Sequence, residues 1–320
     1  MLNKTFFPNL KILTIKENNF SSIVPLGTQL QLSFDDLVTY FKNADYAWIF
    51  LAMLMGLLSH LSRAYRWLYQ LEPLGYNVKL GNSIMAVFAT YLINYTIPRA
   101  GEVARASILT NYEGVPFEKS FGTIVAERIA DLIVMIGIIS VTLFLQFDFI
   151  YQFLAERFNP SFIFLGLAVL FLAFIIFTQY IQKSKSAFAV RIKTFVNGLV
   201  EGALSIFKMK KKWAFIFHTF FIWGMYLLMF YTTSLSIEEL NGIPIGAVLI
   251  GFISASFSIA ATNGGIGSYP VAVFAAFSIF GIAKEPSIAF GWIMWTSQTI
   301  MIIVLGGISL LYLPIFNRKK

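Results

Sequence analysis

Apolar residues in this chain form long runs that are separated by short polar segments. A membrane-spanning helix needs about 20 predominantly apolar residues, because the hydrocarbon core of a bilayer is about 30 Å thick. Runs that reach or approach this length cover Tyr46–Leu71, Phe117–Phe147, Phe162–Ile181, Ala214–Leu235 and Ser287–Leu313. The pattern predicts an all-α polytopic membrane protein with a membrane domain at 46–313, a polar or interfacial lead-in at 1–45 and a basic tail at 314–320.

One further apolar segment is too short to span and is followed at once by a second short helix. Ser83–Ile97 stops near Asn94, Pro98 and Gly101, and Arg99–Asn111 follows it. Non-helical backbone within a bilayer is tolerated only where it is buried in protein or lines a water-filled cavity. The segment therefore predicts a broken or re-entrant helix pair, although two thin full spans would give the same topology.

A second pair of the same kind lies nearer the C-terminus. Its halves are Ile245–Ala261 and 269–282, and the break between them contains Asn263, Gly264, Gly265 and Gly267. Loop charges predict that the first pair enters from the cytoplasm and the second from outside. Interrupted segments that approach from opposite faces are typical of inverted-repeat transporters with a site near the middle of the membrane. The sequence shows no clear residue-level repeat, so this prediction rests on hydropathy and topology.

The composition supports a membrane protein and excludes several kinds of site. The 320 residues are 58% hydrophobic and 12% charged, whereas a soluble domain averages about 25% charged residues. The chain has no Cys, which excludes disulfides and thiolate ligands, and its two His residues lie far apart in sequence. We therefore expect no metal site and no cofactor. The abundant Phe and Tyr residues are expected to face lipid and form interfacial belts.

Positive charge is concentrated between residues 183 and 212 and at the C-terminus. The cations of this loop are Lys183, Lys185, Arg191, Lys193, Lys208, Lys210, Lys211 and Lys212. Apolar residues recur among them at helical spacing, which predicts an amphipathic helix that contacts the anionic lipids of the cytoplasmic leaflet. The net charge of +8 therefore indicates orientation and lipid contact, and no nucleic-acid partner is expected.

Three charged residues follow the first break directly. Arg99, Glu102 and Arg105 can form an ordinary interfacial helix whose charges face water and headgroups. The functional interpretation is that Arg99 and Arg105 hold a lipid phosphate, because guanidinium groups make bidentate contacts with phosphate oxygens. Glu102 would then orient the two arginines or bind a cation of the headgroup.

Three more charged residues, Glu127, Arg128 and Asp131, lie within the run at 117–147. Such charges cost roughly 2.5–3.5 kcal/mol each on insertion scales, so chains retain them mainly where they pair or line a polar cavity. Glu127 and Asp131 share a helical face and repel each other unless a cation lies between them or one is protonated. We expect Arg128 or Arg99 to be that cation. The group is a structural ion network, a part of the substrate site, or both.

Other polar positions have simpler interpretations. Arg63, Arg66 and Trp67 are expected to anchor the end of the first span at the interface, and His60 to be an ordinary helix residue near it. The glycine-rich break is either a plain helix break or a site where backbone N–H groups face an anion. The candidate substrate-binding residues are Asn94, Pro98, Arg99, Gly101, Glu102, Arg105, Glu127, Arg128, Asp131, Asn263, Gly264, Gly265 and Gly267.

Two of these motifs carry a family resemblance over most of the chain. Asn94-(x3)-Pro98-Arg99-Ala-Gly101-Glu102-(x2)-Arg105, followed by Glu127-Arg128-(x2)-Asp131, resembles the lysylphosphatidylglycerol synthase transmembrane region, or flippase-like domain family. Asn263-Gly264-Gly265-Ile266-Gly267 resembles the second glycine-rich break of that family, and Arg63-Ala-Tyr-Arg66-Trp67 also fits it. In the bifunctional members, this region moves aminoacylated phospholipid across the bilayer, and a separate soluble domain attaches the amino acid.

The resemblance implies a protein of the bacterial inner membrane that flips a phospholipid or a lipid-linked polar headgroup. The chain ends seven residues after Leu313, so we expect no synthase domain and no enzymatic activity. An anionic phospholipid or lipid-linked molecule would be the substrate, and a separate synthase or transferase would be a partner. The alternatives are a membrane component of lipid-linked sugar or headgroup transfer, and an accessory or small-solute transport protein.

Overall fold

The computed structural model describes residues 33–157, 160–193 and 209–318. Within these ranges every regular element is a helix, which confirms the predicted all-α class. In chain order, the helices are α2 Phe34–Asn43, α3 Tyr46–Leu71, η1 Glu72–Leu74, α4 Leu80–Thr96, α5 Ala100–Glu113, α6 Phe117–Leu145, α7 Phe147–Arg157, α8 Pro160–Lys183, α10 Lys212–Ser234, η2 Glu238–Leu240, α11 Ile245–Ala261, α12 Ser268–Ser278 and α13 Lys284–Phe316.

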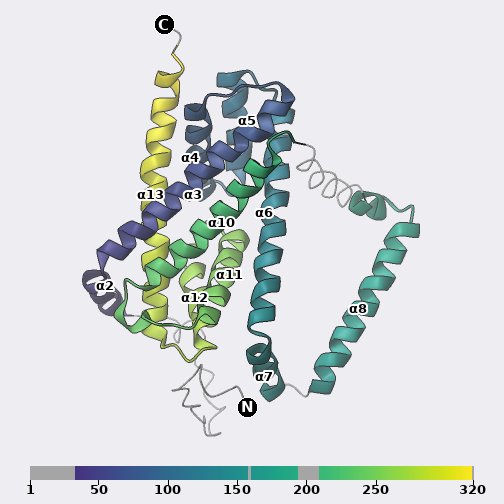
Figure 1. Ribbon diagram of the computed structural model, residues 1–320, viewed down its shortest axis with the longest axis vertical. Helices are drawn as coiled ribbons and strands as arrows, with labels where there is room; N and C mark the ends of the chain where they lie inside the picture. Colours follow the sequence, from purple (N-terminus) through teal and green to yellow (C-terminus); the bar gives the residue numbers. More distant parts are fainter. Residues whose placement is uncertain (1–32, 158–159, 194–208, 319–320) are drawn as a thin grey trace.

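Four of the described helices are long and apolar enough to cross a membrane. These segments are Tyr46–Leu74, Phe117–Leu145, Lys212–Ser234 and Lys284–Phe316, and each matches a span predicted from the sequence. Helix α8 covers the remaining predicted span and stands apart from the other helices (Figure 1). The chain is therefore a multi-pass membrane protein.

Hydrogen bonds between distant segments fix the direction of the long helices. Asn82 at the start of α4 exchanges side-chain amide hydrogen bonds of 2.7 and 2.8 Å with Asn317 at the end of α13. At the opposite end of the molecule, the Asp45 N–H donates to the Ser236 carbonyl at 2.9 Å. Helices α3 and α13 thus end on the same side of the protein, where α4 begins.

Both interrupted segments fold as helical hairpins, as predicted. Helices α4 and α5 form the first hairpin, and α11 and α12 form the second. The first hairpin starts beside the end of α13, while the second starts beside η2 at the other end of the molecule. Figure 1 shows the pairs α4–α5 and α11–α12 in opposite halves of the fold. The hairpins therefore enter from opposite ends.

Aromatic side chains fill the core between the second hairpin and the long helices. Phe230 of α10 lies 4.9 Å from Phe290 of α13 and 6.3 Å from Phe277 of α12, measured between ring centroids. Both contacts are edge-on, and the three rings are fully buried. Gly251 of α11 makes room for this cluster, because a Cβ there would lie 2.6 Å from the Phe277 ring. The second hairpin is thus held mainly by apolar packing.

The two ends of the molecule differ in charge. Lys79, Lys211 and Arg318 lie at the end where α3 and α13 terminate, while Glu238 and Glu239 lie at the other end. This asymmetry agrees with the predicted orientation, in which the basic end faces the cytoplasm. Half of the predicted amphipathic helix at 183–212 lies outside the described residues, and the described part includes a helical stretch from 187 to 193.

Most of the predicted N-terminal lead-in also lies outside the described residues. Its described part contains α2, which begins after a Ser33 side chain that accepts a hydrogen bond from the Asp36 N–H at 3.2 Å. No residue of α2 is buried, and the Tyr40 hydroxyl donates to Glu239 at 3.3 Å. The interfacial character of the lead-in therefore stays a prediction. At the other terminus α13 continues to Phe316, so the first residues of the predicted tail are helical.

Candidate functional site

Five buried charged side chains bring α3, α5 and α6 together. We call Arg63, Arg66, Arg105, Glu127 and Asp131 the ion network. Arg63 Nη1 lies 2.7 Å from both Glu127 Oε1 and Asp131 Oδ2. Arg66 Nη1 lies 3.0 Å from Asp131 Oδ1, and Arg105 lies 3.2 Å from Glu127 through both of its terminal nitrogens. Three guanidinium groups therefore share two carboxylates in the protein interior.

Neighbouring side chains fix the orientation of these guanidinium groups. Arg66 Nη1 also donates to the Thr219 hydroxyl of α10 at 2.8 Å, which ties a fourth helix to the network. The Arg105 guanidinium lies over the Trp67 ring, 3.9 Å from its centroid, and the Trp67 indole donates to Thr123 at 2.8 Å. Such cation–π contacts strengthen when they are removed from water. The network is thus packed as well as paired.

The position of Arg63, Arg66 and Trp67 corrects the sequence interpretation. They do not anchor the helix at the interface, because their exposed fractions are 4%, 0% and 0%. The prediction that Arg128 or Arg99 lies between the Glu127 and Asp131 carboxylates was also wrong. Arg63 and Arg66 contact both carboxylates instead. A signal for this arrangement exists in α3, where polar residues recur at helical spacing at Ser59, Ser62, Arg63, Arg66 and Gln70.

The other predicted charges form a separate, more exposed pair. Arg128 Nη2 lies 2.7 Å from Glu102 Oε1, and the exposed fractions of the two side chains are 44% and 22%. Asn94 of α4 donates to Glu102 at 3.3 Å and accepts from the Gly101 N–H at 2.8 Å. Gly101 permits this close approach, because a Cβ there would lie 2.2 Å from the Thr90 carbonyl oxygen. Asn94 and Gly101 therefore hold the two halves of the first hairpin together, at the break where the sequence placed them.

Arg99 forms the tip of the first hairpin together with Pro98. Its backbone has φ 61° and ψ 6°, and it is the one non-glycine residue with positive φ in the described part of the chain. This left-handed conformation costs about 1–2 kcal/mol in an L-residue. The Arg99 side chain is exposed, and none of the described residues pairs with it. A strained residue at a hairpin tip, with a free cation, is typical of a functional position.

Glycines form the tip of the second hairpin. Gly264, Gly265 and Gly267 have φ values of 67°, 79° and 68°, which only glycine adopts without strain. Helix α12 begins at the next residue, Ser268, one residue before the predicted start, and ends at Ser278, four residues before the predicted end. The Trp295 indole of α13 donates to the Gly264 carbonyl at 2.8 Å. The break is thus an ordered turn fixed by its neighbours.

The tips of the two hairpins touch each other. Asn263 of the second tip donates to the Tyr95 carbonyl of the first at 2.9 Å. Gly264 packs against the Tyr95 ring, since a Cβ there would lie 2.5 Å from Tyr95 Cε1. The Tyr95 hydroxyl accepts from Thr299, which lies near the middle of α13, at 3.2 Å. The contact therefore lies midway along the longest membrane-spanning helix.

A cavity of about 980 Å³ lies beside this contact and is called the central cavity. Its charged lining residues are Arg63, Arg99, Glu102, Arg128 and Asp131. Of the remaining predicted site residues, Asn94, Pro98, Asn263 and Gly264 also line it, whereas Gly101, Arg105, Glu127, Gly265 and Gly267 do not. The volume is at the upper end of the range for small-molecule sites, which is about 300–1,000 Å³.

The sequence interpretation missed the uncharged wall of the cavity. His60 is not an interfacial residue but is buried, with its ring 4.5 Å from that of Tyr91 and its Nδ1 3.5 Å from the Tyr226 hydroxyl. Trp223 and Trp295 also face the cavity rather than lipid. An aromatic residue on a membrane helix can face either lipid or a cavity, and the sequence does not distinguish the two. The aromatic wall of the cavity therefore could not be predicted from the sequence.

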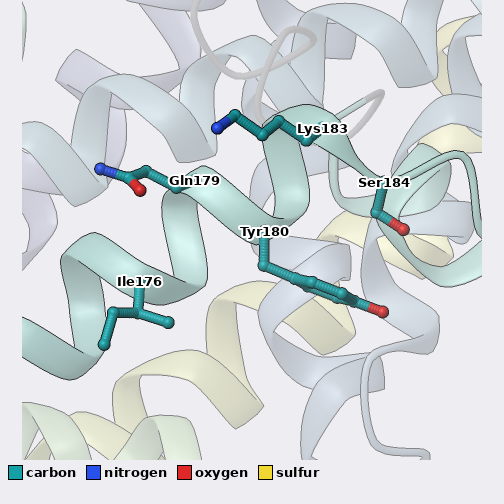
Figure 2. Close-up of a pocket in the computed structure, with 5 residues that line it drawn as sticks. All are labelled: Ile176, Gln179, Tyr180, Lys183 and Ser184. Carbon is teal, nitrogen blue, oxygen red and sulfur yellow. The ribbon is translucent and has the colours of Figure 1, made fainter.

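A second hollow of about 430 Å³ lies at the end of α8 (Figure 2). All of its lining residues come from one short stretch of chain, Ile176, Gln179, Tyr180, Lys183 and Ser184. Figure 2 shows Gln179 and Lys183 extending on one side of the helix, with Tyr180 and Ser184 on the other. This hollow contains none of the converging charges found in the central cavity. We therefore place the candidate site in the central cavity.

Comparison with known families agrees with the motifs. A model of the family described as "Lysylphosphatidylglycerol synthase TM region" matches residues 21–307. The chain belongs to this family. A UPF0104 membrane protein of Methanocaldococcus jannaschii is 23% identical to this chain, over 92% of this chain and 93% of the relative. A UPF0104 membrane protein of Pyrococcus horikoshii is 25% identical, over 87% of this chain and 89% of the relative.

A third relative of this chain is named as a glycosyltransferase rather than as a UPF0104 membrane protein. Glycosyltransferase AglD of Haloferax volcanii is 28% identical over 109 residues, which cover 34% of this chain and 18% of the relative. No solved structure matches the chain. In the described part of the chain, no group of three or more His, Cys, Asp or Glu side chains is placed to hold a metal ion.

Proposed function

We propose that this protein translocates a phospholipid, or another lipid-linked polar headgroup, across the membrane through the central cavity. One observation carries the proposal: two hairpins that enter from opposite ends touch at their tips beside a cavity whose wall contains Arg63, Arg99 and Arg128. Broken helices that meet near the middle of the membrane are the usual site of transporters built from opposed segments. Ionisable residues at that depth generally mark a substrate path.

The charges of the site divide into two roles under this proposal. Glu127 and Arg105 are buried and paired and do not line the cavity, so they hold α5 against α6 and do not contact a substrate there. Arg99 is exposed in the cavity, and a guanidinium group there can bind a phosphate through two parallel hydrogen bonds. Arg128 and Glu102 lie beside it as a pair that can open when a phosphate arrives. Arg99 would therefore be the first contact of the headgroup.

The same proposal includes a location and partners. The protein would act in the cytoplasmic membrane of a bacterium without an enzymatic step of its own. The basic segment at 183–212 would contact anionic lipids of the cytoplasmic leaflet. A separate synthase or transferase would supply the lipid substrate.

A second candidate function is supported by the similarity to AglD. The relative named as a glycosyltransferase shares 28% identity over 109 residues, so the protein would be the membrane component of a lipid-linked sugar transfer. Under this alternative, the cavity would hold the lipid-linked acceptor without moving it. A transfer assay with membranes that contain the protein, with and without the intact cavity, distinguishes the two functions.

A flipping assay in proteoliposomes tests the proposal directly. Purified protein is reconstituted with fluorescent lipids of several headgroups, and a membrane-impermeant quencher measures how much label reaches the outer leaflet. We expect wild-type protein to expose inner-leaflet label faster than empty vesicles, and Arg99→Ala to reduce this rate at least tenfold. The expected loss follows from the removal of the one unpaired cation among the described residues of the cavity wall.

Arg318→Ala is the matched control, because Arg318 is also an exposed arginine but lies at the end of the chain, outside the cavity. It is expected to flip lipid at the wild-type rate. Equal rates for Arg99→Ala and Arg318→Ala would exclude the cavity as the path. The absence of movement for every lipid, with intact binding, would favour the transfer function.

A further inference from the structure

The carboxylates around the central cavity are all occupied by arginines. Asp131 contacts Arg63 and Arg66, and also accepts from the Trp223 indole at 3.4 Å. Glu102, the other carboxylate of the wall, lies 2.7 Å from Arg128. An amino group on a headgroup would therefore find no free carboxylate in the described lining. A cationic headgroup would have to displace an existing ion pair in a partly dry site, which is unfavourable.

One cation, in contrast, remains available on the same wall. Arg99 lines the cavity and has no partner among the described residues, and the Nε atom of Arg63, another lining residue, is buried without a hydrogen-bond partner. Together the ion network and the cavity contain five guanidinium groups and three carboxylates. This excess of positive charge favours a bound anion, because buried cations are stable only when they are compensated.

One uncharged donor in the cavity is also unsatisfied. Gln298 of α13 lines the cavity, and its side-chain amide nitrogen is buried and has no hydrogen-bond partner in the described structure. A buried donor without a partner is destabilising, and a ligand oxygen can recover that loss on binding. Gly56 of α3 keeps the space that this side chain occupies, since a Cβ there would lie 2.8 Å from Gln298 Oε1. The amide therefore has a defined place in the wall.

The rest of the wall is aromatic with polar edges. Tyr91, Tyr226, Trp223 and Trp295 all line the cavity, and the hydroxyl groups of the two tyrosines lie 3.4 Å apart, while the two indole N–H groups are hydrogen-bonded to Asp131 and Gly264. Rings of this kind combine apolar contact with hydrogen bonding at one edge. At about 980 Å³ the cavity is also larger than a bare phosphate requires. The wall thus suits a headgroup that carries a hydroxylated ring next to its negative charge.

From these observations we infer that the central cavity selects an anionic headgroup with a hydroxylated ring, a sugar or inositol phosphate, over an aminoacylated headgroup. This inference rests on the proposed function for its site, and it adds the substrate class. Arg99 binds the phosphate, Gln298 donates to a ring oxygen, and the aromatic side chains contact the ring face. The two sources of this chemistry are an inositol phospholipid and a sugar linked to a polyprenyl phosphate.

A binding measurement in detergent tests the inference independently of translocation. The probes are dioctanoyl phosphatidylinositol, farnesyl phosphoglucose, dioctanoyl phosphatidic acid and dioctanoyl lysylphosphatidylglycerol, and the readout is the change in intrinsic tryptophan fluorescence. We expect at least one of the ring-bearing lipids to bind about tenfold more tightly than phosphatidic acid, and lysylphosphatidylglycerol to bind most weakly. Whichever ring-bearing lipid binds more tightly identifies the source.

Two variants separate the two parts of the headgroup. Arg99→Ala should weaken all three anionic probes about tenfold, whereas Gln298→Leu should weaken only the ring-bearing probes and leave phosphatidic acid unchanged. Arg318→Ala should bind as the wild type does. Lysylphosphatidylglycerol binding as tightly as the ring-bearing lipids would overturn the inference, and so would a Gln298→Leu loss that is equal for all probes. If the expected order holds but no lipid is flipped, the translocation proposal fails while the inference stands.

Discussion

The two hairpins of this protein have the same outline but are held by opposite means. In the first, a buried network of five charged side chains ties α5 to α3 and α6, and the tip is a strained arginine. In the second, no Asp, Glu, Lys or Arg occurs between Ile245 and Ser278, and the tip is a run of glycines. The second packs through Phe252, Phe277 and their neighbours. One hairpin is ionic and the other is apolar.

The difference shows that the charged groups and the close backbone contacts of a membrane site can come from separate hairpins. Charges need partners, so the first hairpin is tied to α3 and α6 by the ion network, and its unpaired Arg99 faces the cavity. Glycines need only space, so the second hairpin can bring its backbone against Tyr95 without any charge. The first hairpin therefore contributes Arg99 and Glu102 to the charges of the site, and the second contributes a closely fitting uncharged wall.

Of the substitutions considered, removal of the Glu127 carboxylate should lower the free energy of unfolding most. Glu127→Ala leaves three buried guanidinium groups with Asp131 alone, and the loss of one partner of a buried pair costs about 3–5 kcal/mol. We expect the free energy of unfolding, measured by SDS titration in micelles, to fall by that amount. Glu118→Ala, on the exposed face of the same helix, should change it by less than about 0.5 kcal/mol. Equal losses would show that the network does not hold the hairpin.

Alanine substitutions at two glycines of the apolar hairpin should destabilise the protein by different, smaller amounts. Gly264 and Gly267 have nearly the same φ, but a Cβ on Gly264 would lie 2.5 Å from Tyr95 Cε1, whereas one on Gly267 would meet open space. Gly264→Ala should therefore destabilise the protein by about 1–3 kcal/mol more than Gly267→Ala, because it adds overpacking to the same backbone strain.

Thermal unfolding in detergent measures this difference between the alanine variants. Tyr95→Leu removes the ring atoms that the new Cβ would meet, so the double variant with Gly264→Ala should recover most of the extra loss. Failure of this rescue would mean that the tips are not in contact.

The strain at Arg99 gives the smallest expected effect. Glycine adopts φ 61° freely, so Arg99→Gly should be about 1 kcal/mol more stable than Arg99→Ala in the same unfolding measurement. Both variants lose the guanidinium group and should lose lipid movement equally. A stable but inactive Arg99→Gly protein would show that the chain retains strain at this tip for function. Activity in either variant would place the cation elsewhere.

Much of the architecture could be predicted from the sequence because hydropathy records it directly. The break at Pro98 and the one at Gly264–Gly267 interrupt apolar runs, so both hairpins and their opposed entry follow from run length and loop charge. The pairing within the site could not be predicted in the same way. Arg63 and Arg66 lie near a helix end beside Trp67, a pattern that equally fits an interfacial anchor, and only the tertiary contacts show them buried.

The uncharged residues of the cavity were hidden for a related reason. Gln298 lies in an apolar stretch of α13, and its position opposite Gly56 depends on how α3 and α13 pack. Small residues and local shape determine how membrane helices pack in pairs, and this packing is difficult to predict from a single sequence. The charged residues and the helix breaks could therefore be predicted from the sequence, whereas the uncharged wall of the cavity could be identified only from the structure.

The contact between Tyr95 and Asn263 has an electrical consequence. The two hairpins meet at their tips, so a headgroup that passed this contact would move from the surroundings of one hairpin to those of the other. A full crossing of the membrane is worth about 2.3 kcal/mol per elementary charge per 100 mV. An anionic headgroup that took this route would be driven by the membrane voltage, whereas a zwitterionic one would not. The polarisation of the cell would then set the leaflet in which the anionic lipid accumulates.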